Sequence, residues 1–327
     1  MTTDFPIVSA PGKLFLMGEY GVLDGHPAVV AAVDRRVTGR FVAGASPATP
    51  LINEVIESVR AHLVEAGAVL PSGAPQIDSA ALSSETGKLG LGSSAAVAAA
   101  GVGAMLAAAR CDLEYTRGLA FFLASRAHRA AQGGRGSGAD VAASVYGGIV
   151  YFARRENEVD VQSLDLPDGV APIVFSTRTP SSTVDHLRAF EAYAEREPEA
   201  SKARLDTIGA LARSFTTACV QQDARLAVET AARVNAELEE LGREIGLPIV
   251  TPSLAAAAKL AEELGGAAKP SGAGGGDVGV AFLTSDGAAA TFRRRAPHIG
   301  VEILSITTGA RGLCREPSGP ERNHVEA

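Results

Sequence analysis

The chain of 327 residues is 46% hydrophobic and 20% charged, so it is long and apolar enough for one large or two smaller packed domains, and disorder is excluded. A formal net charge of −7 gives no electrostatic support to nucleic-acid binding, and the three separated cysteines (Cys111, Cys219 and Cys314) form neither a zinc-ligand spacing nor a disulfide framework. Because no segment resembles a secretory leader or is long enough to span a bilayer, we expect a cytoplasmic protein with no membrane partner. A monomer and a homodimer both remain open.

Short apolar runs between turn residues predict that strands gather in the first part of the chain. These strands are expected at 7–10, 14–17, 28–33, 37–43 and 149–153. Pro11, Gly12 and Lys13 would join the first two strands by a tight bend. Helices are predicted at 51–66, at 95–109 and at 112–132, the last of them beginning at an Asp112 cap.

The second part of the chain is predicted to be mostly helical. A strand is expected at 171–177, followed by helices at 183–195, 201–219, 222–245 and 251–264, a strand at 278–283, a helix at 286–295 and a strand at 302–307. The polar stretch that ends near 167–169 divides the chain into predicted domains at 1–168 and 169–327. Because strands come early and helices lie in the middle, the predicted fold class is α+β and not a doubly wound parallel sheet.

A glycine- and serine-rich stretch at 88–96 runs directly into the Ala-rich helix predicted at 95–109. A helix start has unpaired N–H groups and a partial positive charge, and Gly90 and Gly92 allow an anion to approach the backbone closely. Ser93 and Ser94 add hydroxyl groups. We interpret the stretch as a phosphate-binding loop, although by itself it fits a capped packing helix equally well.

Two further glycine-rich loops accompany this one. Residues 133–138 form a glycine-dense loop that leads to Asp140, and residues 271–276 form another that ends at Asp277. Together with Pro11, Gly12 and Lys13, the loops at 90–94 and 271–276 resemble in order and spacing the three motifs of the GHMP kinases. The resemblance runs from Ala10 to about Arg311. It implies a two-domain GHMP kinase fold, with an N-terminal ATP-binding domain like domain 2 of ribosomal protein S5 and a ferredoxin-like C-terminal domain.

The resemblance also implies roles for individual residues, with ATP and Mg²⁺ as the cofactors. Lys13 and Asp140 would be catalytic, Lys13 by offsetting charge on the transferred group and Asp140 by accepting or orienting the acceptor's proton. Ser94 would be the metal ligand. The residues expected to bind the ATP phosphates are Lys88, Gly90, Gly92, Ser93, Ser94 and Ala95. Those expected to bind the substrate are Lys13, Glu19, Tyr20, Arg135, Ser137, Gly138, Asp140, Ser271, Gly272, Ala273 and Gly274.

Within the family, several stretches resemble the phosphomevalonate kinase group, so phosphomevalonate and ATP are the expected small-molecule partners. Tyr20 follows Glu19 where mevalonate kinases usually place a histidine, and 136–148 is the most telling match. Mevalonate kinases also carry a glutamate before the Asp140-type residue, whereas 126–139 contains no acidic residue. Mevalonate kinase, another small-alcohol kinase and a non-catalytic ligand sensor of the same fold are the alternatives.

A phosphate acceptor changes what the site must provide. Its second pKa lies near ~6, so it is mostly deprotonated at neutral pH and needs a strong general base less than an alcohol does. Holding two anionic phosphates together requires additional cations, for which Lys88, Arg135, Arg178 and Lys269 are candidates. His128 is expected to face a helix and to serve packing. Met105, Phe121 and Phe122 are expected in the core by their spacing.

Overall fold

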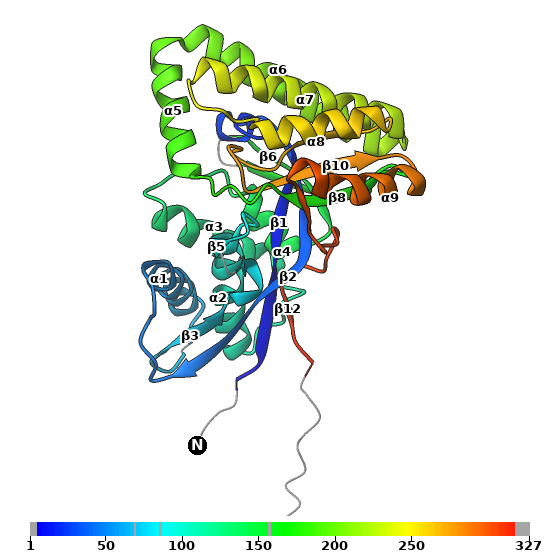
Figure 1. Ribbon diagram of the computed structural model, residues 1–327. Helices are drawn as coiled ribbons and strands as arrows, with labels where there is room; N and C mark the ends of the chain where they lie inside the picture. Colours follow the sequence, from blue (N-terminus) through cyan, green and yellow to red (C-terminus); the bar gives the residue numbers. More distant parts are fainter. Residues whose placement is uncertain (1–4, 69, 85–86, 156–157, 318–327) are drawn as a thin grey trace, which may run out of the picture.

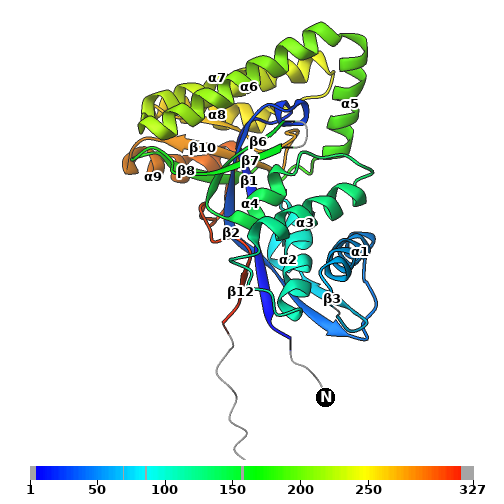
Figure 2. The ribbon, with the colours of Figure 1, turned by 180° about the vertical axis from the view of Figure 1, so that it is seen from behind.

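The computed structural model describes residues 5–68, 70–84, 87–155 and 158–317. Over these residues the chain forms two larger antiparallel sheets, each covered by helices, which confirms the α+β class. Figures 1 and 2 show the first sheet with α1, α2 and α3 in one half of the molecule and the second sheet under α6, α7 and α8 in the other half. No helix in the described part of the chain combines the length and apolarity that a bilayer crossing needs.

The first sheet has the strand order β12-β1-β2-β6-β7, and β3 also pairs with β2. Its strands are β1 (Ile7–Met17), β2 (Ala28–Ala43), β3 (Gly73–Asp78), β6 (Ile149–Arg155), β7 (Glu158–Leu164) and β12 (Cys314–Arg315). The short strands β4 (Ser83–Ser84) and β5 (Gly87–Lys88) pair only with each other. No strand was predicted at β3, β7 or β12, because edge strands with polar residues lack an apolar pattern.

The expected bend at Pro11, Gly12 and Lys13 is wrong, because β1 runs unbroken through these residues. The signal that suggested a bend is a bulge in the pairing of β1 with β2 between Pro11 and Lys13. Gly12 is required here because a Cβ would lie 2.7 Å from the carbonyl oxygen of Leu91. β2 is likewise one strand, with Asp34 and Arg35 exposed within it. The lysine therefore stands on a rigid strand and not on a loop.

Four helices cover the first sheet: α1 (Pro50–Glu65), α2 (Ser93–Ala108), α3 (Arg117–Ala131) and α4 (Ala139–Tyr146). α2 is buried almost all round, since its small side chains let neighbouring elements approach closely. α3 begins five residues later than expected, because Asp112 caps a separate turn by accepting bonds from the backbone N–H groups of Glu114 and Tyr115. Phe122 is exposed, contrary to its predicted core position, whereas Met105 and Phe121 are buried.

The second sheet has the order β11-β8-β10-β9 and supports the remaining helices. The strands are β8 (Ala171–Ser176), β9 (Ala267–Pro270), β10 (Val278–Leu283) and β11 (Glu302–Ile303). The helices are α5 (Thr183–Arg196), α6 (Pro198–Gln221), α7 (Ala224–Glu244), α8 (Pro252–Glu263) and α9 (Asp286–Arg295), which agree with the predicted positions. Figure 1 shows α6, α7 and α8 stacked over this sheet.

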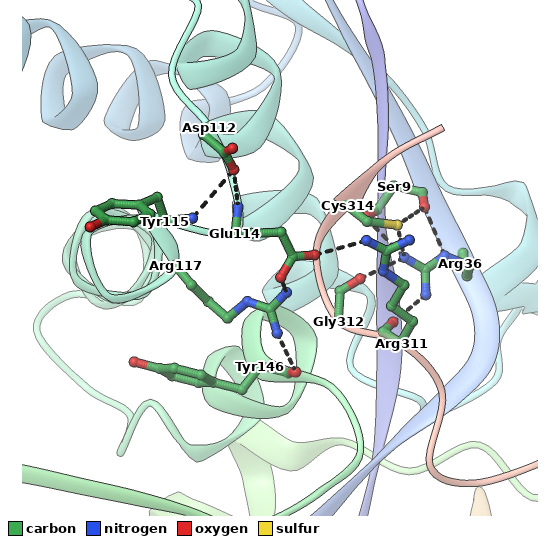
Figure 3. Close-up of polar contacts among 10 residues, drawn as sticks. All are labelled: Ser9, Arg36, Asp112, Glu114, Tyr115, Arg117, Tyr146, Arg311, Gly312 and Cys314. Atoms are coloured by element: carbon green, nitrogen blue, oxygen red, sulfur yellow. Dashed lines mark hydrogen bonds and ion pairs between the residues drawn. The ribbon is translucent and has the colours of Figure 1, made fainter. Parts of the chain in front are cut away.

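The turn after β1 and the segment that returns from the second sheet both help to join the halves of the molecule. The turn after β1 packs on α6, where a Cβ at Gly209 would lie 2.4 Å from the His26 ring. The chain then returns from the second sheet, and its segment 311–315 lies against the first sheet, where Arg36 donates to the carbonyl oxygens of Ser9 (3.0 Å) and Gly312 (2.8 Å) (Figure 3). Arg311 reaches Glu114 at 2.8 Å beside these bonds. Strand β12 thus belongs to the first sheet, although it comes from the end of the described chain. The predicted domain division at 168/169 stays a prediction.

Candidate functional site

A cavity of about 650 Å³ lies where the two halves of the molecule meet. It is lined from the first half by β1, by the loop before α2 and by the loop between α3 and α4, and from the second half by α5 and the loop between β9 and β10. The predicted residues on its wall are Lys13, Glu19, Tyr20, Gly90, Gly92, Ser93, Ser94, Arg135, Ser137, Asp140, Gly272 and Ala273. The three glycine-rich loops and Lys13 of β1 are therefore brought together, although they lie far apart in the sequence.

Lys13 projects from the bulged part of β1 and is 9% exposed. Burial lowers the pKa of its amine below the ordinary lysine value, while the carboxylates of Asp140, Glu19 and Asp277 favour its charged form. Its backbone N–H donates to the carbonyl oxygen of Leu91 at 2.8 Å, which ties β1 to the loop before α2. The side chain thus lies at the centre of three acidic groups.

The loop before α2 is shaped by two glycines with positive φ. Gly92 (φ 73) is the N-cap of α2, and no side chain caps this helix. A Cβ at Gly92 would lie 2.6 Å from the Cγ atom of Lys13, so only glycine leaves room for the lysine stem. Ser93 and Ser94 are the first two residues of the helix and line the cavity. The uncapped N–H groups of this turn can bind an anion.

Asp140 lies in the first turn of α4, after Gly138, whose φ of 91° starts the helix. One carboxylate oxygen accepts from the backbone N–H of Val141 at 2.9 Å, and the other lies 3.9 Å from the Nδ1 atom of His128. Asp140 lines the cavity from the first half of the molecule, and the β9–β10 loop lines it from the second half. The glycine-dense sequence before it therefore delivers Asp140 as expected.

The β9–β10 loop closes the cavity from the second half of the molecule. A Cβ at Gly272 would lie 3.8 Å from the Nζ atom of Lys13, and the Tyr20 hydroxyl donates to the carbonyl oxygen of Ala273 at 2.6 Å. Burial raises the pKa of Asp277, while a bond from the backbone N–H of Ser181 and the charge of Lys13 oppose the rise. Asp277 was noted in the sequence without a role. Its carboxylate interacts electrostatically with Lys13, and a Cβ at Gly90 would lie 3.0 Å from the Asp277 Cβ atom.

A buried ion pair stands behind the loop. Lys269 contacts a Glu19 carboxylate oxygen, and its Nζ atom donates to the carbonyl oxygen of Pro270 at 2.6 Å. Burial lowers the pKa of Lys269, and the Glu19 charge opposes this. The second carboxylate oxygen of Glu19, Oε2, has no hydrogen-bond partner in the described structure, although Glu19 borders the cavity. Lys269 is thus committed to Glu19 and does not itself line the cavity.

Ala95, Gly138, Ser271 and Gly274 lie within the same loops but are not on the wall that the described residues form, and a Cβ at Gly274 would instead meet Ile249. Arg135 is on the wall and forms an exposed ion pair with Glu191 of α5 at 3.6 Å. Arg178 pairs with Glu302 away from the cavity. The side chain of Lys88 is outside the described structure.

The wall contributed by the start of α5 and by the end of α3 was not predicted from the sequence. Ser181, Thr183, Val184 and Leu187 line the cavity from the start of α5, and Gln132 lines it from the end of α3. Residues 177–183 resemble the loop that opens the second domain in the phosphomevalonate kinase group, and this was the available signal for the first group. Nothing in the sequence pointed to Gln132, which has no motif of its own.

Comparisons with known proteins show the family of the chain. The family model described as "GHMP kinases N terminal domain" matches residues 54–148, and "GHMP kinases C terminal" matches 220–301. A phosphomevalonate kinase from Streptomyces sp. (strain CL190) is 33% identical, over 93% of this chain and 97% of its own. A mevalonate kinase from Archaeoglobus fulgidus is 30% identical, over 83% of this chain and 89% of its own.

A solved structure of Streptococcus pneumoniae phosphomevalonate kinase, in complex with phosphomevalonate and AMPPNP, has the same fold. It superposes with a TM-score of 0.81 at 22% identity and covers 92% of this chain and 99% of its own. This likeness confirms the two-domain architecture expected from the three motifs. The chain therefore belongs to the GHMP kinase family and is an ATP-dependent kinase.

Proposed function

We propose that the chain transfers the γ-phosphoryl group of ATP to the phosphate of (R)-5-phosphomevalonate, forming 5-diphosphomevalonate in the mevalonate route to isoprenoids. The observation that carries this proposal is that Lys13 and Asp140 line one cavity with the Gly90–Ser94 loop. The Streptomyces relative bears the name of this activity, and the Streptococcus protein of the same fold binds phosphomevalonate and a nucleotide analogue in one complex.

The start of α2 is the proposed seat of the nucleotide phosphates. Its uncapped backbone N–H groups and its helix dipole favour negative charge, and the glycines before it leave the backbone accessible. Gly90 and Gly92 line the cavity on this side. The expected phosphate-binding role of the 90–94 loop is therefore retained as a proposal.

Lys13 would neutralise charge on the phosphoryl group during transfer. Phosphoryl transfer is accelerated by positioning and by electrostatic stabilisation more than by covalent help. In its buried position the Lys13 amine is poorly screened, so its charge acts strongly on a group that enters the cavity. The surrounding carboxylates of Asp140, Glu19 and Asp277 favour the protonated form that this role requires.

Asp140 would orient the acceptor. A phosphate monoester is mostly deprotonated at neutral pH, because its second pKa lies near ~6. The carboxylate then has little proton abstraction to perform, and its value lies in holding Lys13 charged and in fixing the acceptor's geometry. An alcohol acceptor would depend on Asp140 much more strongly.

The oxygen ligands on the cavity wall fit Mg²⁺. Mg²⁺ prefers oxygen ligands and usually takes one or two protein groups together with substrate phosphates and water. Ser94 and Asp140 supply a hydroxyl and a carboxylate on the same wall, and no cluster of three or more His, Cys, Asp or Glu in the described segments competes with them. When bound, the ion would neutralise the phosphate charges of the nucleotide.

The charged groups on the wall are few for two anionic substrates. On the part of the wall that the described residues form, Lys13 and Arg135 lie together with the carboxylates of Glu19, Asp140 and Asp277. Glu19 is neutralised by Lys269, which leaves two cations against two anions. The helix start and the metal ion would therefore provide much of the charge that binds phosphates, and Arg135 is the cation best placed for the acceptor.

A substrate panel tests the proposal. Purified protein is assayed by coupled ADP release with phosphomevalonate, mevalonate, galactose and homoserine, each with MgATP. We expect turnover on phosphomevalonate alone. Turnover on mevalonate but not on its phosphate would establish the alternative that the Archaeoglobus relative suggests, and nucleotide binding without transfer to any acceptor would indicate a ligand sensor.

A further inference from the structure

His128 lies in the last turn of α3, directly behind the cavity wall, although the sequence suggested only packing for it. It is 4% exposed. Its Nε2 atom lies 3.0 Å from the Ser94 hydroxyl oxygen and 3.1 Å from the amide nitrogen of Gln132. Its Nδ1 atom lies 3.9 Å from the Asp140 carboxylate. One imidazole ring thus connects the first turn of α2 with the first turn of α4.

These partners define the tautomer of the ring. In the orientation that the structure gives the Gln132 amide, its N–H group points to the ring and donates, so we assign Nε2 as the acceptor and the ring proton to Nδ1. The Nδ1–H group faces Asp140, which is an acceptor. The Ser94 hydroxyl meets the same Nε2 lone pair, so it also donates toward His128.

A hydroxyl group that donates inward presents its oxygen lone pairs outward. Ser94 lines the cavity, whereas His128 does not, so the lone pairs of Ser94 face the cavity. In this state Ser94 can bind a cation, but it cannot donate to a phosphate oxygen. A free serine hydroxyl could do either, and the nucleotide phosphates would attract its proton.

We propose that His128 is a positioning residue that holds the Ser94 hydroxyl as an oxygen ligand for the divalent cation while its other ring nitrogen steadies Asp140. The inference rests on the magnesium-dependent activity proposed above. In it, the buried His128 side chain determines whether the Ser94 hydroxyl binds the metal ion or donates to a phosphate. Residues behind a metal ligand commonly act in this way by fixing the ligand's orientation.

Nucleotide binding tests this assignment without turnover. The affinity of the full chain for ADP is measured by calorimetry with and without saturating Mg²⁺, and the ratio of the two affinities is the readout. We expect His128→Ala to reduce this ratio about 10-fold or more, as is typical of residues behind a metal ligand. The affinity for ADP alone should stay the same or rise, because the Ser94 hydroxyl is then free to donate to a phosphate.

Two size-conserving variants separate the two nitrogen positions. In His128→Gln the amide oxygen can take the place of Nε2 and accept from Ser94, so most of the Mg²⁺ effect should return. In His128→Asn the shorter amide can face Asp140 but does not reach Ser94, so the effect should stay low. If both variants behave alike, the ring only fills volume and the proposal is overturned; this pair also serves if His128→Ala does not fold.

A double variant shows whether His128 acts through Ser94. If it does, Ser94→Ala and the Ser94→Ala/His128→Ala double variant have the same Mg²⁺ ratio, whereas multiplicative losses refute the coupling. If the unmodified protein binds ADP no better with Mg²⁺, the proposed magnesium role fails and this inference fails with it. If the unmodified protein shows the Mg²⁺ effect and the His128 variants keep it in full, the proposed function survives and the proposed role of His128 is refuted.

Discussion

The contact between Gly92 and Lys13 makes Gly92→Ala a sharp test of the site. The added Cβ would lie 2.6 Å from Cγ and 2.7 Å from Cε of Lys13. Carbon atoms in contact prefer a separation of about 3.5–4.0 Å, so the lysine side chain must move by roughly 1 Å. Alanine at the φ of 73° found here costs a further ~1–2 kcal/mol of stability.

The displacement matters more for activity than for stability. The lysine stem is flexible enough to move aside, so the free energy of unfolding should fall only by about 1–3 kcal/mol. A reacting group displaced by about 1 Å can lose roughly 10²-fold in rate. We therefore expect a large loss of kcat in the coupled ADP-release assay, with a small decrease in melting temperature.

Gly246→Ala is the matched control. Gly246 has a similar φ of 69°, but a Cβ there would meet no atom within 4 Å, and the residue does not line the cavity. It should show the stability loss of backbone strain alone and an unchanged kcat. The reasoning is refuted if Gly92→Ala keeps its kcat, or if the two variants lose activity equally.

Four further predictions concern charge in the site. Lys13→Ala should abolish most activity, whereas Asp140→Asn should lose clearly less, since a phosphate acceptor needs little proton abstraction; equal losses would contradict this. Because burial lowers the pKa of Lys13 and the protonated form is needed, kcat should fall with rising pH before the ordinary lysine value of 10.5 is reached, and a pH profile that stays flat to that value would exclude the role. Lys269→Met should destabilise the fold by about 3–5 kcal/mol in denaturant unfolding, because Glu19 is left buried without its partner, and adding Glu19→Gln should restore much of the loss. Arg135→Ala should raise the KM for the phosphorylated acceptor while changing stability by at most about 1 kcal/mol, since its ion pair is exposed; an unchanged KM would remove Arg135 from the acceptor site.

The helices were largely predictable because their signals are local. Thr49 and Pro50 begin α1, and the apolar spacing of its buried face continues to Leu63. The same holds for α6 to α9, where the predicted and observed limits agree closely. The start of α3 was wrong because Asp112 can cap either a turn or a helix, and the residues after it decide between the two.

Strand pairing was less predictable because it depends on distant partners. β9, which holds Lys269, carries too few residues to show a pattern, and it is a strand because β10 pairs with it. β12 pairs with β1 across some 300 residues of chain. The apparent bend at Gly12 proved to be a bulge, since strand β2 and the Leu91 carbonyl approach that glycine from outside its own segment.

By itself the sequence determined the family, the α+β class, the helices and the three glycine-rich loops, because composition, periodicity and motif order lie in consecutive residues. Only the tertiary structure decided which side chains meet: it placed Lys13 among three carboxylates, paired Lys269 with Glu19, and set His128 behind Ser94 and Asp140. Such contacts depend on which face of each strand or helix turns inward and on how the two halves of the molecule pack, and that information is distributed over the whole chain.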